Sequence, residues 1–519
     1  LPDAGEQEPL AEYRIANVKT SSTDKDASSA FLKYADFSHY VDYFNGMEDE
    51  NIVQAIPNAK ASEWMEENIP LFECPQRNFE EMYYYRWWSL RKHIKKTPVG
   101  YGMTEFLVQR SYSDKYNLIA CAIGHHIYES RWLRDPKYLD QIIHTWYRGN
   151  DGGPMKKMDK FSSWNADAVL ARYMVDGDKD FMLDMTKDLE TEYQRWERTN
   201  RLKNGLYWQG DVQDGMEESI SGGRKKKYAR PTINSYMYGN AKALSIMGIL
   251  SGDEGMAMRY GMRADTLKSL VENDLWNTRH QFFETMRTDS SANVREAIGY
   301  IPWYFNLPDT TKKYEVAWKE IMDEKGFSAP YGLTTAERRH PEFRTRGVGK
   351  CEWDGAIWPF ASAQTLTAMA NFMNNYPQTV LSDSVYFRQM ELYVESQYHR
   401  GRPYIGEYLD EVTGYWLKGD QERSRYYNHS TFNDLMITGL VGLRPRLDDT
   451  IEINPLIPAD KWDWFCLDNV LYHGYNLTIL WDKNGDRYHC GKGLRIFVNG
   501  KEAGHADTLT RLVCENALK

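Results

Sequence analysis

The sequence predicts a mainly α-helical protein with a small β-module at its C-terminal end. Between residues 78 and 443, apolar residues recur at helical spacing, as in the segment 181–196. After Arg444-Pro445, short strand-like runs and Asn-Gly turns replace this pattern. We therefore expect an N-terminal arm at 1–77, a helical domain at 78–443 and a β-module at 444–519.

The N-terminal arm is polar and irregular, with a patch rich in Thr, Ser and Asp at 20–29. We expect short helices in this arm.

The helical domain contains roughly a dozen candidate helices, separated by turn signals such as Asp135-Pro136 and Gly252-Asp253. The candidate helices lie at 78–96, 115–132, 136–148, 163–176, 179–198, 232–251, 254–273, 310–323, 356–374, 380–399 and 428–442. Helices joined in hairpins, without a repeat of about 34–45 residues, predict an (α/α)6 toroid of six hairpins rather than a solenoid.

The β-module is predicted from short runs at 451–455, 475–481 and 494–500 and from the turns at 483–486 and 498–501. We expect it to pack on the toroid and to carry no chemistry. Two long segments of the helical domain, 199–231 and 324–355, contain Trp, Gly and acidic residues with little periodicity. Segments of this length inside a compact domain are usually functional or disordered, and their aromatic content favours function.

Composition narrows the range of partners. The net charge is −10, and the one basic run, at 224–227, is short, which argues against nucleic acid or an anionic membrane as the main partner. No apolar run approaches the roughly 20 residues that span a bilayer. The six Cys are scattered without a CxxC pair, so neither a disulfide scaffold nor a zinc site is expected. The chain begins at Leu1 rather than Met, which leaves an exported or periplasmic location and a cytoplasmic one both open.

The aromatic content points to carbohydrate. The chain has 17 Trp, 36 Tyr and 19 Phe, more rings than a core requires. Trp and Tyr present a flat apolar face and a polar edge, which suit the faces and hydroxyl rims of sugars. Helix packing is the simpler explanation for about half of them.

Two separated carboxylate motifs are each flanked by aromatic residues. The first is Asp214-Gly215-Met216-Glu217-Glu218-Ser219, shortly after Trp208, and the second is Glu407-Tyr408-Leu409-Asp410-Glu411-Val412-Thr413-Gly414. Hydrolysis of a glycosidic bond needs one acid to protonate the leaving oxygen and one base to activate water. Any single Glu is more simply a surface residue, so the hypothesis depends on the pair.

These motifs resemble those of a known group of enzymes. Over most of residues 78–445 the chain is similar to the clan of six-hairpin glycosidases, which includes trehalases, processing α-glucosidase I enzymes and bacterial mannosylglycerate hydrolases, and to bacterial proteins described as related to glycogen debranching. Gly215-Met216-Glu217-x-Ser219 matches the general-acid motif of the clan, with Glu in place of the usual Asp and Met in place of Trp. The resemblance implies Glu217 as general acid, with Asp214 as the rival.

The same resemblance implies the base. The segment from Glu407 to Gly414 matches the general-base motif of the clan, although Glu411 stands where Pro is common. Glu407 is therefore the expected base, beside Tyr408. The clan inverts the anomeric configuration, which implies a carboxyl separation of about 6.5–9.5 Å with water between the groups.

A third segment, Glu352-Trp353-Asp354-Gly355-Ala356-Ile357-Trp358-Pro359, resembles the part of trehalases that lines the sugar site. The resemblance implies that Trp353 and Trp358 stack on the terminal sugar and that Asp354 accepts hydrogen bonds from its hydroxyls. The alternative is a helix N-terminus with Asp354 as cap and Trp358 in the core.

Other candidates lie at the starts of predicted helices. Arg230, Asn234 and Trp164 would face the cavity of a toroid, although helix capping explains such positions equally well. His125 and Glu129 are four residues apart and invite a metal interpretation, but no third ligand is near in sequence. A sugar-contacting or buried His125 is the favoured interpretation.

The sequence thus predicts an exo-acting inverting α-glycosidase that removes a terminal glucose- or mannose-type sugar from an oligosaccharide or glycoconjugate. It predicts no cofactor and no metal site, while a structural Ca²⁺ stays open. Two alternatives are a lyase or hydrolase of uronic acid substrates and a catalytically silent carbohydrate-binding protein. The sugar, the linkage, the aglycone and the oligomeric state are not determined by the sequence.

Overall fold

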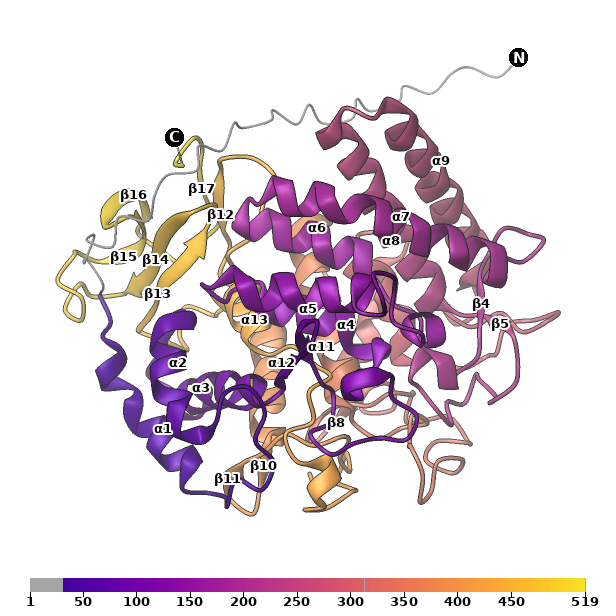
Figure 1. Ribbon diagram of the computed structural model, residues 1–519, viewed down its shortest axis with the longest axis horizontal. Helices are drawn as coiled ribbons and strands as arrows, with labels where there is room; N and C mark the ends of the chain where they lie inside the picture. Colours follow the sequence, from indigo (N-terminus) through magenta and orange to yellow (C-terminus); the bar gives the residue numbers. More distant parts are fainter. Residues whose placement is uncertain (1–30, 312, 519) are drawn as a thin grey trace.

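The computed structural model describes residues 31–311 and 313–518, and it has a helical body with a sheet at one end. Figure 1 shows the helices from indigo to orange and the C-terminal strands in yellow beside them. The predicted patch at 20–29 lies outside the described residues.

The N-terminal segment contains short helices, α1 (Ser38–Asn45) and α2 (Ala61–Asn68), followed by the short strand β1 (Leu71–Glu73). Strand β1 pairs antiparallel with a strand of the C-terminal module. The arm is therefore built into the C-terminal sheet, which the sequence analysis did not anticipate.

Most predicted helices are present. The α-helices from residue 77 onward are α3 (Arg77–Lys92), α4 (Ile123–Ser130), α5 (Pro136–Arg148), α6 (Asn165–Asp176), α7 (Lys179–Asn200), α8 (Pro231–Ser251), α9 (Glu254–Leu270), α10 (Ile301–Tyr304), which was not predicted, α11 (Pro359–Asn375), α12 (Asp383–Ser396) and α13 (Asn433–Leu435). The turn signals act as expected: Asp135, Asp178 and Asp253 accept hydrogen bonds from backbone N–H groups in the first turns of α5, α7 and α9. Gly177 ends α6 with a φ of 71°, a conformation that glycine adopts without strain.

Some predicted helices are shorter or replaced. In 115–132 only α4 is α-helical, because Tyr116 and Asn117 have positive φ and the chain before α4 is partly extended. In 310–323 a 3-10 helix covers Glu315–Ile321. In 428–442, α13 is followed by a π-helical turn at Met436–Leu440. Helix α10 was not predicted, because a four-residue helix has too little periodicity to detect.

Six helices contact one another in a closed order. Helix α4 packs against α6, α6 against α8, α8 against α10, α10 against α11, α11 against α13, and α13 against α4. Most residues of α8 and α11 are buried, as expected for helices that other helices surround on most sides. Helices α7 and α9 pack on α8, and α12 packs on α11.

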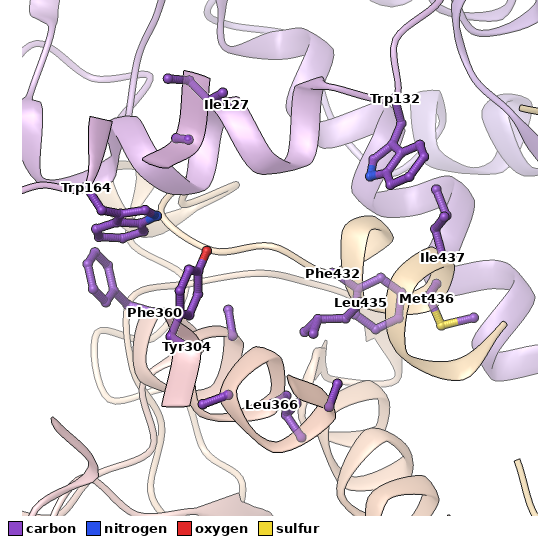
Figure 2. Packing of buried hydrophobic residues seen from close by; sticks show 14 of the residues in the cluster. Ile127, Trp132, Trp164, Tyr304, Phe360, Leu366, Phe432, Leu435, Met436 and Ile437 are labelled. Carbon is purple, nitrogen blue, oxygen red and sulfur yellow. The ribbon is translucent and has the colours of Figure 1, made fainter. Parts of the chain in front are cut away.

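Figure 2 shows side chains that fill the space between these helices. Trp164, just before α6, points toward Phe360 of α11 and Tyr304 of α10. The ring centroids of Trp164 and Tyr304 are 5.8 Å apart, and those of Trp164 and Phe360 are 6.3 Å apart. Aromatic rings from three helices thus meet edge to face, which stabilises the core beyond the burial of their area.

A buried carboxylate joins α4 to α13. Glu129 of α4 accepts hydrogen bonds from the backbone N–H groups of Phe432, Asn433 and Asp434, at 2.8–3.2 Å. These N–H groups belong to the first turn of α13 and have no partner within that helix. Glu129 is therefore engaged in the contact that closes the helix order.

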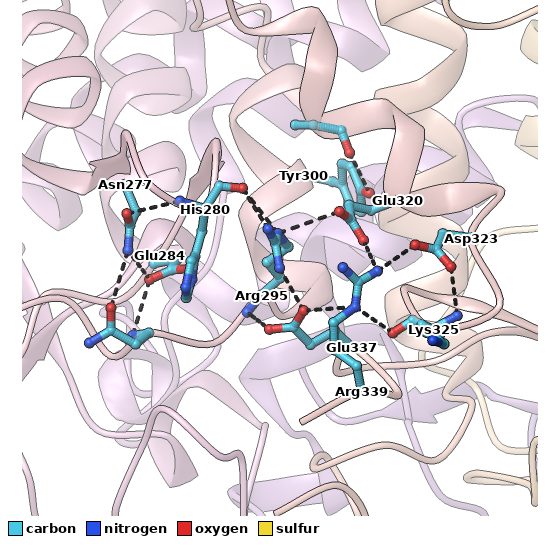
Figure 3. A network of polar contacts seen from close by, with 12 residues as sticks. Asn277, His280, Glu284, Arg295, Tyr300, Glu320, Asp323, Lys325, Glu337 and Arg339 are labelled. Carbon is cyan, nitrogen blue, oxygen red and sulfur yellow. Dashed lines mark hydrogen bonds and ion pairs between the residues drawn. The ribbon is translucent and has the colours of Figure 1, made fainter. Parts of the chain in front are cut away.

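The long segment between α9 and α11 is ordered by a polar network. Arg295 pairs with Glu337 at 2.7 Å, and Arg339 pairs with Glu320 at 2.7 Å and with Asp323 at 2.6 Å (Figure 3). Arg295 and Glu337 are 42 residues apart in sequence, and Arg339 pairs with residues 19 and 16 positions before it. The network replaces helical structure as the constraint on this part of the chain.

The C-terminal module is a five-stranded sheet in the order β1-β13-β14-β15-β16, beside the pair β12 (Ile451–Ile453) and β17 (Leu512–Cys514). Its remaining strands are β13 (Trp464–Tyr472), β14 (Tyr475–Asp482), β15 (Gly493–Val498) and β16 (Lys501–Ala506). The β15–β16 turn has positive φ at both Asn499 and Gly500, as the Asn-Gly signal predicted. The sequence analysis missed β13 and placed β14 and β15 to within two residues.

We expect Glu129→Ala to lower the free energy of unfolding by about 3–5 kcal/mol, because it leaves several buried N–H groups without an acceptor. Chemical denaturation followed by circular dichroism measures this. Glu395→Ala is the matched control, because it removes a carboxylate whose contact with Arg388 is largely exposed and should cost less than about 1 kcal/mol. Equal stability of the two variants would contradict the role given to Glu129.

Candidate active site

The first carboxylate motif forms an irregular loop that packs against the start of α8. Glu217 is partly exposed on this loop, whereas Asp214 is buried. Glu218, the next residue, has a positive φ of 65° and pairs with Arg224 at 2.8 Å. The two acidic neighbours therefore have different environments, and Glu217 forms no ion pair within the described residues.

Asp214 holds this loop to the helical body. Its Oδ2 accepts a hydrogen bond from the Nε of Arg230 at 2.6 Å, and both side chains are fully buried. The hydroxyls of Ser162 and Thr232 donate to the same carboxylate. Arg230 and Thr232 lie at the start of α8, where the helix dipole favours a negative charge. With these contacts made, Asp214 fits a positioning role better than that of proton donor.

Further contacts fix the loop after Glu217. Arg346 donates to the carbonyl oxygen of Ile220 at 2.6 Å, and the N–H of Ser221 donates to Glu296 at 3.2 Å. The guanidinium of Arg230 also lies 3.3 Å from the hydroxyl of Ser221. Arginines from both long segments predicted to be functional therefore position the loop of Glu217.

The second carboxylate motif forms a separate wall of the candidate site, the segment around Glu407. Glu407 is buried, and Arg423 pairs with its Oε2 at 3.2 Å. The chain at Gly406 passes so close to Trp416 that an added Cβ would lie 2.7 Å from its ring, so only glycine fits. Leu409 forms a β-bridge with Ile357, which ties this wall to the segment before α11.

Aromatic rings behind Glu407 form a stack. Trp353 and Trp358 are parallel with centroids 4.5 Å apart, and Trp358 stacks on Tyr408 at 4.5 Å. All three are at most 3% exposed. The stack supports the wall, and the predicted contact of Trp353 and Trp358 with a sugar stays a prediction.

The predicted residue Asp354 orders its own loop. Its Oδ2 accepts hydrogen bonds from the N–H groups of Arg346 and Gly347, at 2.7 and 3.0 Å. Its Oδ1 is buried and has no hydrogen-bond partner among the described residues. One oxygen of Asp354 is thus structural, and the other is free to accept from a ligand.

Asn234 and Trp208 are placed together. The amide of Asn234 donates to the carbonyl oxygen of Tyr207 at 2.8 Å and accepts from its N–H at 2.7 Å. Asn234 therefore fixes the backbone beside Trp208 and has little capacity left for a substrate. Trp208 is partly exposed, with the Nζ of Lys227 lying 4.3 Å from its ring centroid.

His125 and Trp164 belong to a buried group of rings around Phe360. The ring centroids of His125, Trp353 and His429 lie 4.5, 5.9 and 5.8 Å from that of Phe360. Burial lowers the pKa of His125 and of His429 well below the usual value, so both rings are neutral at pH 7.

This ring group has an unusual number of polar atoms without partners among the described residues: both ring nitrogens of His125 and of His429, and the Nε1 atoms of Trp164 and Trp353. Buried polar atoms in proteins are nearly always hydrogen-bonded. These atoms are therefore available to bind water or the hydroxyl groups of a ligand.

Glu217 and Glu407 influence each other electrostatically. Burial raises the pKa of Glu217 to about 7, and the charge of Glu407 acts in the same direction. Burial also raises the pKa of Glu407, while the cations Arg423, Lys418 and Arg110 oppose that rise. Glu217 and Glu407 are therefore close enough for the charge of Glu407 to affect the pKa of Glu217.

Sequence reasoning missed a third carboxyl group that is coupled electrostatically to these two. Glu105 is buried, accepts hydrogen bonds from Tyr427 at 2.7 Å and from the thiol of Cys121 at 3.1 Å, and has a pKa that burial raises to about 7. The charges of Glu407 and Glu217 raise the pKa of Glu105 further. The only sequence feature of Glu105 is that it stands next to an aromatic residue, Phe106. Many other acidic residues of the chain also stand next to aromatic residues, so this feature does not identify Glu105.

In the described part of the chain, no group of three or more His, Cys, Asp and Glu side chains is arranged to hold a metal ion. None of the helices described combines the length and the apolar character needed to cross a bilayer.

The family described as the mannosylglycerate hydrolase MGH1-like glycoside hydrolase domain matches residues 115–430, more than half of the chain. This chain belongs to that glycoside hydrolase family. The match contains five of the six helices of the closed order, together with the loop of Glu217 and the segment of Glu407, and it ends just before α13. The C-terminal domain of glycosyl hydrolase family 65 matches residues 443–505, which make up most of the sheet module.

Three solved structures are similar in fold to this chain. A structure named "Sialidase" is 98% identical, with a TM-score of 0.94, and the alignment covers 96% of this chain but 46% of that chain. This chain therefore spans less than half the length of that protein. The GH63 mannosylglycerate hydrolase from Thermus thermophilus, solved in complex with glucose, has 12% identity and a TM-score of 0.52 over 69% of this chain and 99% of that chain. The GH78 rhamnosidase of a Bacillus species has 10% identity and a TM-score of 0.57 over 83% of this chain and 41% of that chain.

We expect Asp214→Asn to lower the free energy of unfolding by about 3–5 kcal/mol, because it leaves the Arg230 charge buried without a counter-ion. Thermal and denaturant unfolding measure this loss. Replacing both partners, Asp214→Leu with Arg230→Met, should cost less than Asp214→Asn alone. Glu218→Gln, on the same loop, is the control and should change stability by less than about 1 kcal/mol. An Asp214→Asn variant of full stability but no activity would instead make Asp214 a catalytic group.

Proposed function

We propose that this glycoside hydrolase is an exo-acting, inverting enzyme in which Glu217 is the general acid and Glu407 the general base. The observation that carries the proposal is the coupling of these two carboxyl groups from separate loops, one with a pKa near 7 and the other beside cations. Pairs of carboxyl groups whose environments separate their protonation states are the usual arrangement for acid and base roles.

Each environment suits its role. Glu217 has a raised pKa and so retains a proton near neutral pH, which it donates to the glycosidic oxygen as the bond to the anomeric carbon breaks. Glu407 is paired with Arg423, which favours the carboxylate form that removes a proton from the attacking water. The C–O bond to the sugar forms on the face opposite the departing group, so the configuration inverts. This chemistry uses two carboxyl groups and water and requires no cofactor.

The closed order of helix contacts supports an (α/α)6 toroid as the scaffold. The residues that precede four of its helices are Trp164 before α6, Arg230 before α8, Trp358 before α11 and Phe432 before α13. Each of these residues takes part in a contact of the candidate site or of the core beside it. Trp164 belongs to the ring group, and Arg230 pairs with Asp214. Trp358 belongs to the aromatic stack, and the N–H of Phe432 donates to Glu129. A single end of a toroid is where such residues would meet.

The first substrates to test are terminal α-linked glucose and mannose, which the resemblance implies. One structural neighbour is named mannosylglycerate hydrolase and another is named rhamnosidase. We therefore add mannosylglycerate and rhamnosides to the substrates to be tested.

A second candidate is hydrolysis of an acidic sugar. Three cations, Arg110, Lys418 and Arg423, lie close enough to Glu407 to oppose the rise in its pKa. Within the described residues, Arg110 and Lys418 form no ion pair, so the site holds more positive charge than the base alone requires. A substrate carboxylate would balance it. The name "Sialidase" of the 98% identical structure also denotes an enzyme of acidic sugars.

We expect Glu407→Gln to reduce monosaccharide release by at least about a thousandfold, because no base then activates the water. The assay is release of monosaccharide from α-glucosides, α-mannosides, rhamnosides, sialosides and uronides, with the first-formed anomer followed by proton NMR. Glu411→Gln, a neighbouring carboxylate paired with Arg344, is the control and should retain most activity. Retained activity in Glu407→Gln, or release of the unchanged anomer, would contradict the mechanism. Release from uronides or sialosides alone would favour the second candidate.

The pH profile distinguishes Glu217 from Glu105. An acid with a pKa of about 7 is protonated below that pH, so kcat/KM should fall as pH rises above about 7. Glu105→Gln should leave this alkaline limb in place, whereas Glu217→Gln should abolish it together with most activity. Loss of the limb in Glu105→Gln would transfer the role of acid to Glu105.

A further inference from the structure

A cavity of about 540 Å³ lies apart from the carboxyl groups of Glu217, Glu407 and Glu105. It lies between the segment after α1, residue Tyr85 of α3, the hairpin of β10 (Tyr398–His399) and β11 (Arg402–Pro403), and the chain from 420 to 426. Its volume is within the range of ligand-binding pockets. None of the residues predicted from the sequence lines it.

The charges in this cavity are unevenly satisfied. Glu48 pairs with Lys92 and accepts from the hydroxyl of Tyr426, and Asp420 pairs with Arg425 at 2.7 Å. By contrast, Arg400 and Arg402 are exposed residues, and their guanidinium groups form no ion pair or hydrogen bond within the described residues. The one remaining lining acid without an ion pair there is Asp49. The lining therefore has two arginines, Arg400 and Arg402, and one carboxylate, Asp49, without an ion pair among the described residues.

Aromatic rings and a free nitrogen complete the lining. Tyr404 and Tyr426 are 7% and 8% exposed and line the cavity. The Nε2 of His399 is buried and has no partner among the described residues, and its ring lies 5.1 Å from that of Tyr404. Tyrosine rings, a free imidazole nitrogen and two arginines can bind the ring, a hydroxyl and a carboxylate of one sugar.

A separate small cavity lies next to this one. The two cavities share the lining residues Glu48, Asp49, Asn51, Arg425 and Tyr426. The small cavity is also lined by Leu107 and Glu422. Their neighbours in sequence are Phe106 and Arg423, whose ring and guanidinium lie 5.8 Å apart, and Arg423 pairs with Glu407. Residues of the same two short segments therefore line the small cavity and contact Glu407 or its partner Arg423.

We propose that this cavity is a second carbohydrate site that binds a uronic acid residue of an oligosaccharide. Arg400 and Arg402 bind its carboxylate, and His399 binds a hydroxyl. The assignment concerns binding alone and holds whether or not Glu217 and Glu407 carry the hydrolysis proposed above.

The test measures affinity in a protein that cannot turn over its ligand. Isothermal titration calorimetry on Glu407→Gln compares trigalacturonate with maltotriose, a neutral trisaccharide. We expect trigalacturonate to bind at least about ten times more tightly, and its affinity to weaken with added salt because the contact is ionic. Equal affinity for the two probes, or no binding of trigalacturonate at millimolar concentration, would overturn the proposal.

Variants locate the site. Adding Arg400→Gln and Arg402→Gln to Glu407→Gln should weaken binding of trigalacturonate by about tenfold or more. Arg198→Gln, which changes an exposed arginine of α7 that forms no ion pair within the described residues, is the matched control and should leave the affinity unchanged. Binding that survives the double change but is lost in Arg110→Gln with Lys418→Gln would place the uronate at the catalytic group instead and would refute the second site.

Discussion

The candidate active site depends on one buried ion pair, between Asp214 and Arg230. Asp214 precedes the proposed acid by three residues, and Arg230 starts α8. Taking both charges out of water costs several kcal/mol. The hydroxyls of Ser162 and Thr232 offset part of this cost, because they complete the hydrogen bonding of the carboxylate. Through this pair the rigid helix determines where the irregular loop can lie. Glu217 needs no contact of its own to be positioned, and it can keep an environment that raises its pKa.

The segment of Glu407 is positioned by different contacts. Glu407 lies on a chain held by the β-bridge between Leu409 and Ile357 and by the stack of Trp353, Trp358 and Tyr408. The aromatic stack removes apolar area from water and gives the wall a rigid back. A site assembled in this way has one face fixed by charge and the other by packing. The two carboxyl groups are thereby held in place by separate elements of the fold.

Much of the helical framework could be predicted from the sequence, because Asp caps and Gly ends such as Asp178 and Gly177 are local signals. The positions of Glu217 and Glu407 came from the resemblance to a known clan, since neither motif has a local signature that separates it from a surface loop. Glu105 and the pairing of β1 with β13 could not be predicted, because both depend on contacts between residues more than 300 apart in the chain. The engagement of Asp214 likewise depends on Ser162, on a different segment.

The strand β1 has a consequence for how the molecule holds together. Residues Leu71–Glu73 pair with Cys466–Asp468, so a segment that lies between α2 and α3 completes the sheet at the C-terminal end. Backbone hydrogen bonds between β1 and β13 thereby join the chain on the two sides of the helical domain. Opening of the sheet would release the start of α3, and loss of the helices would deprive the sheet of its edge strand. The two regions should therefore melt as one cooperative unit, although they match two different domain families.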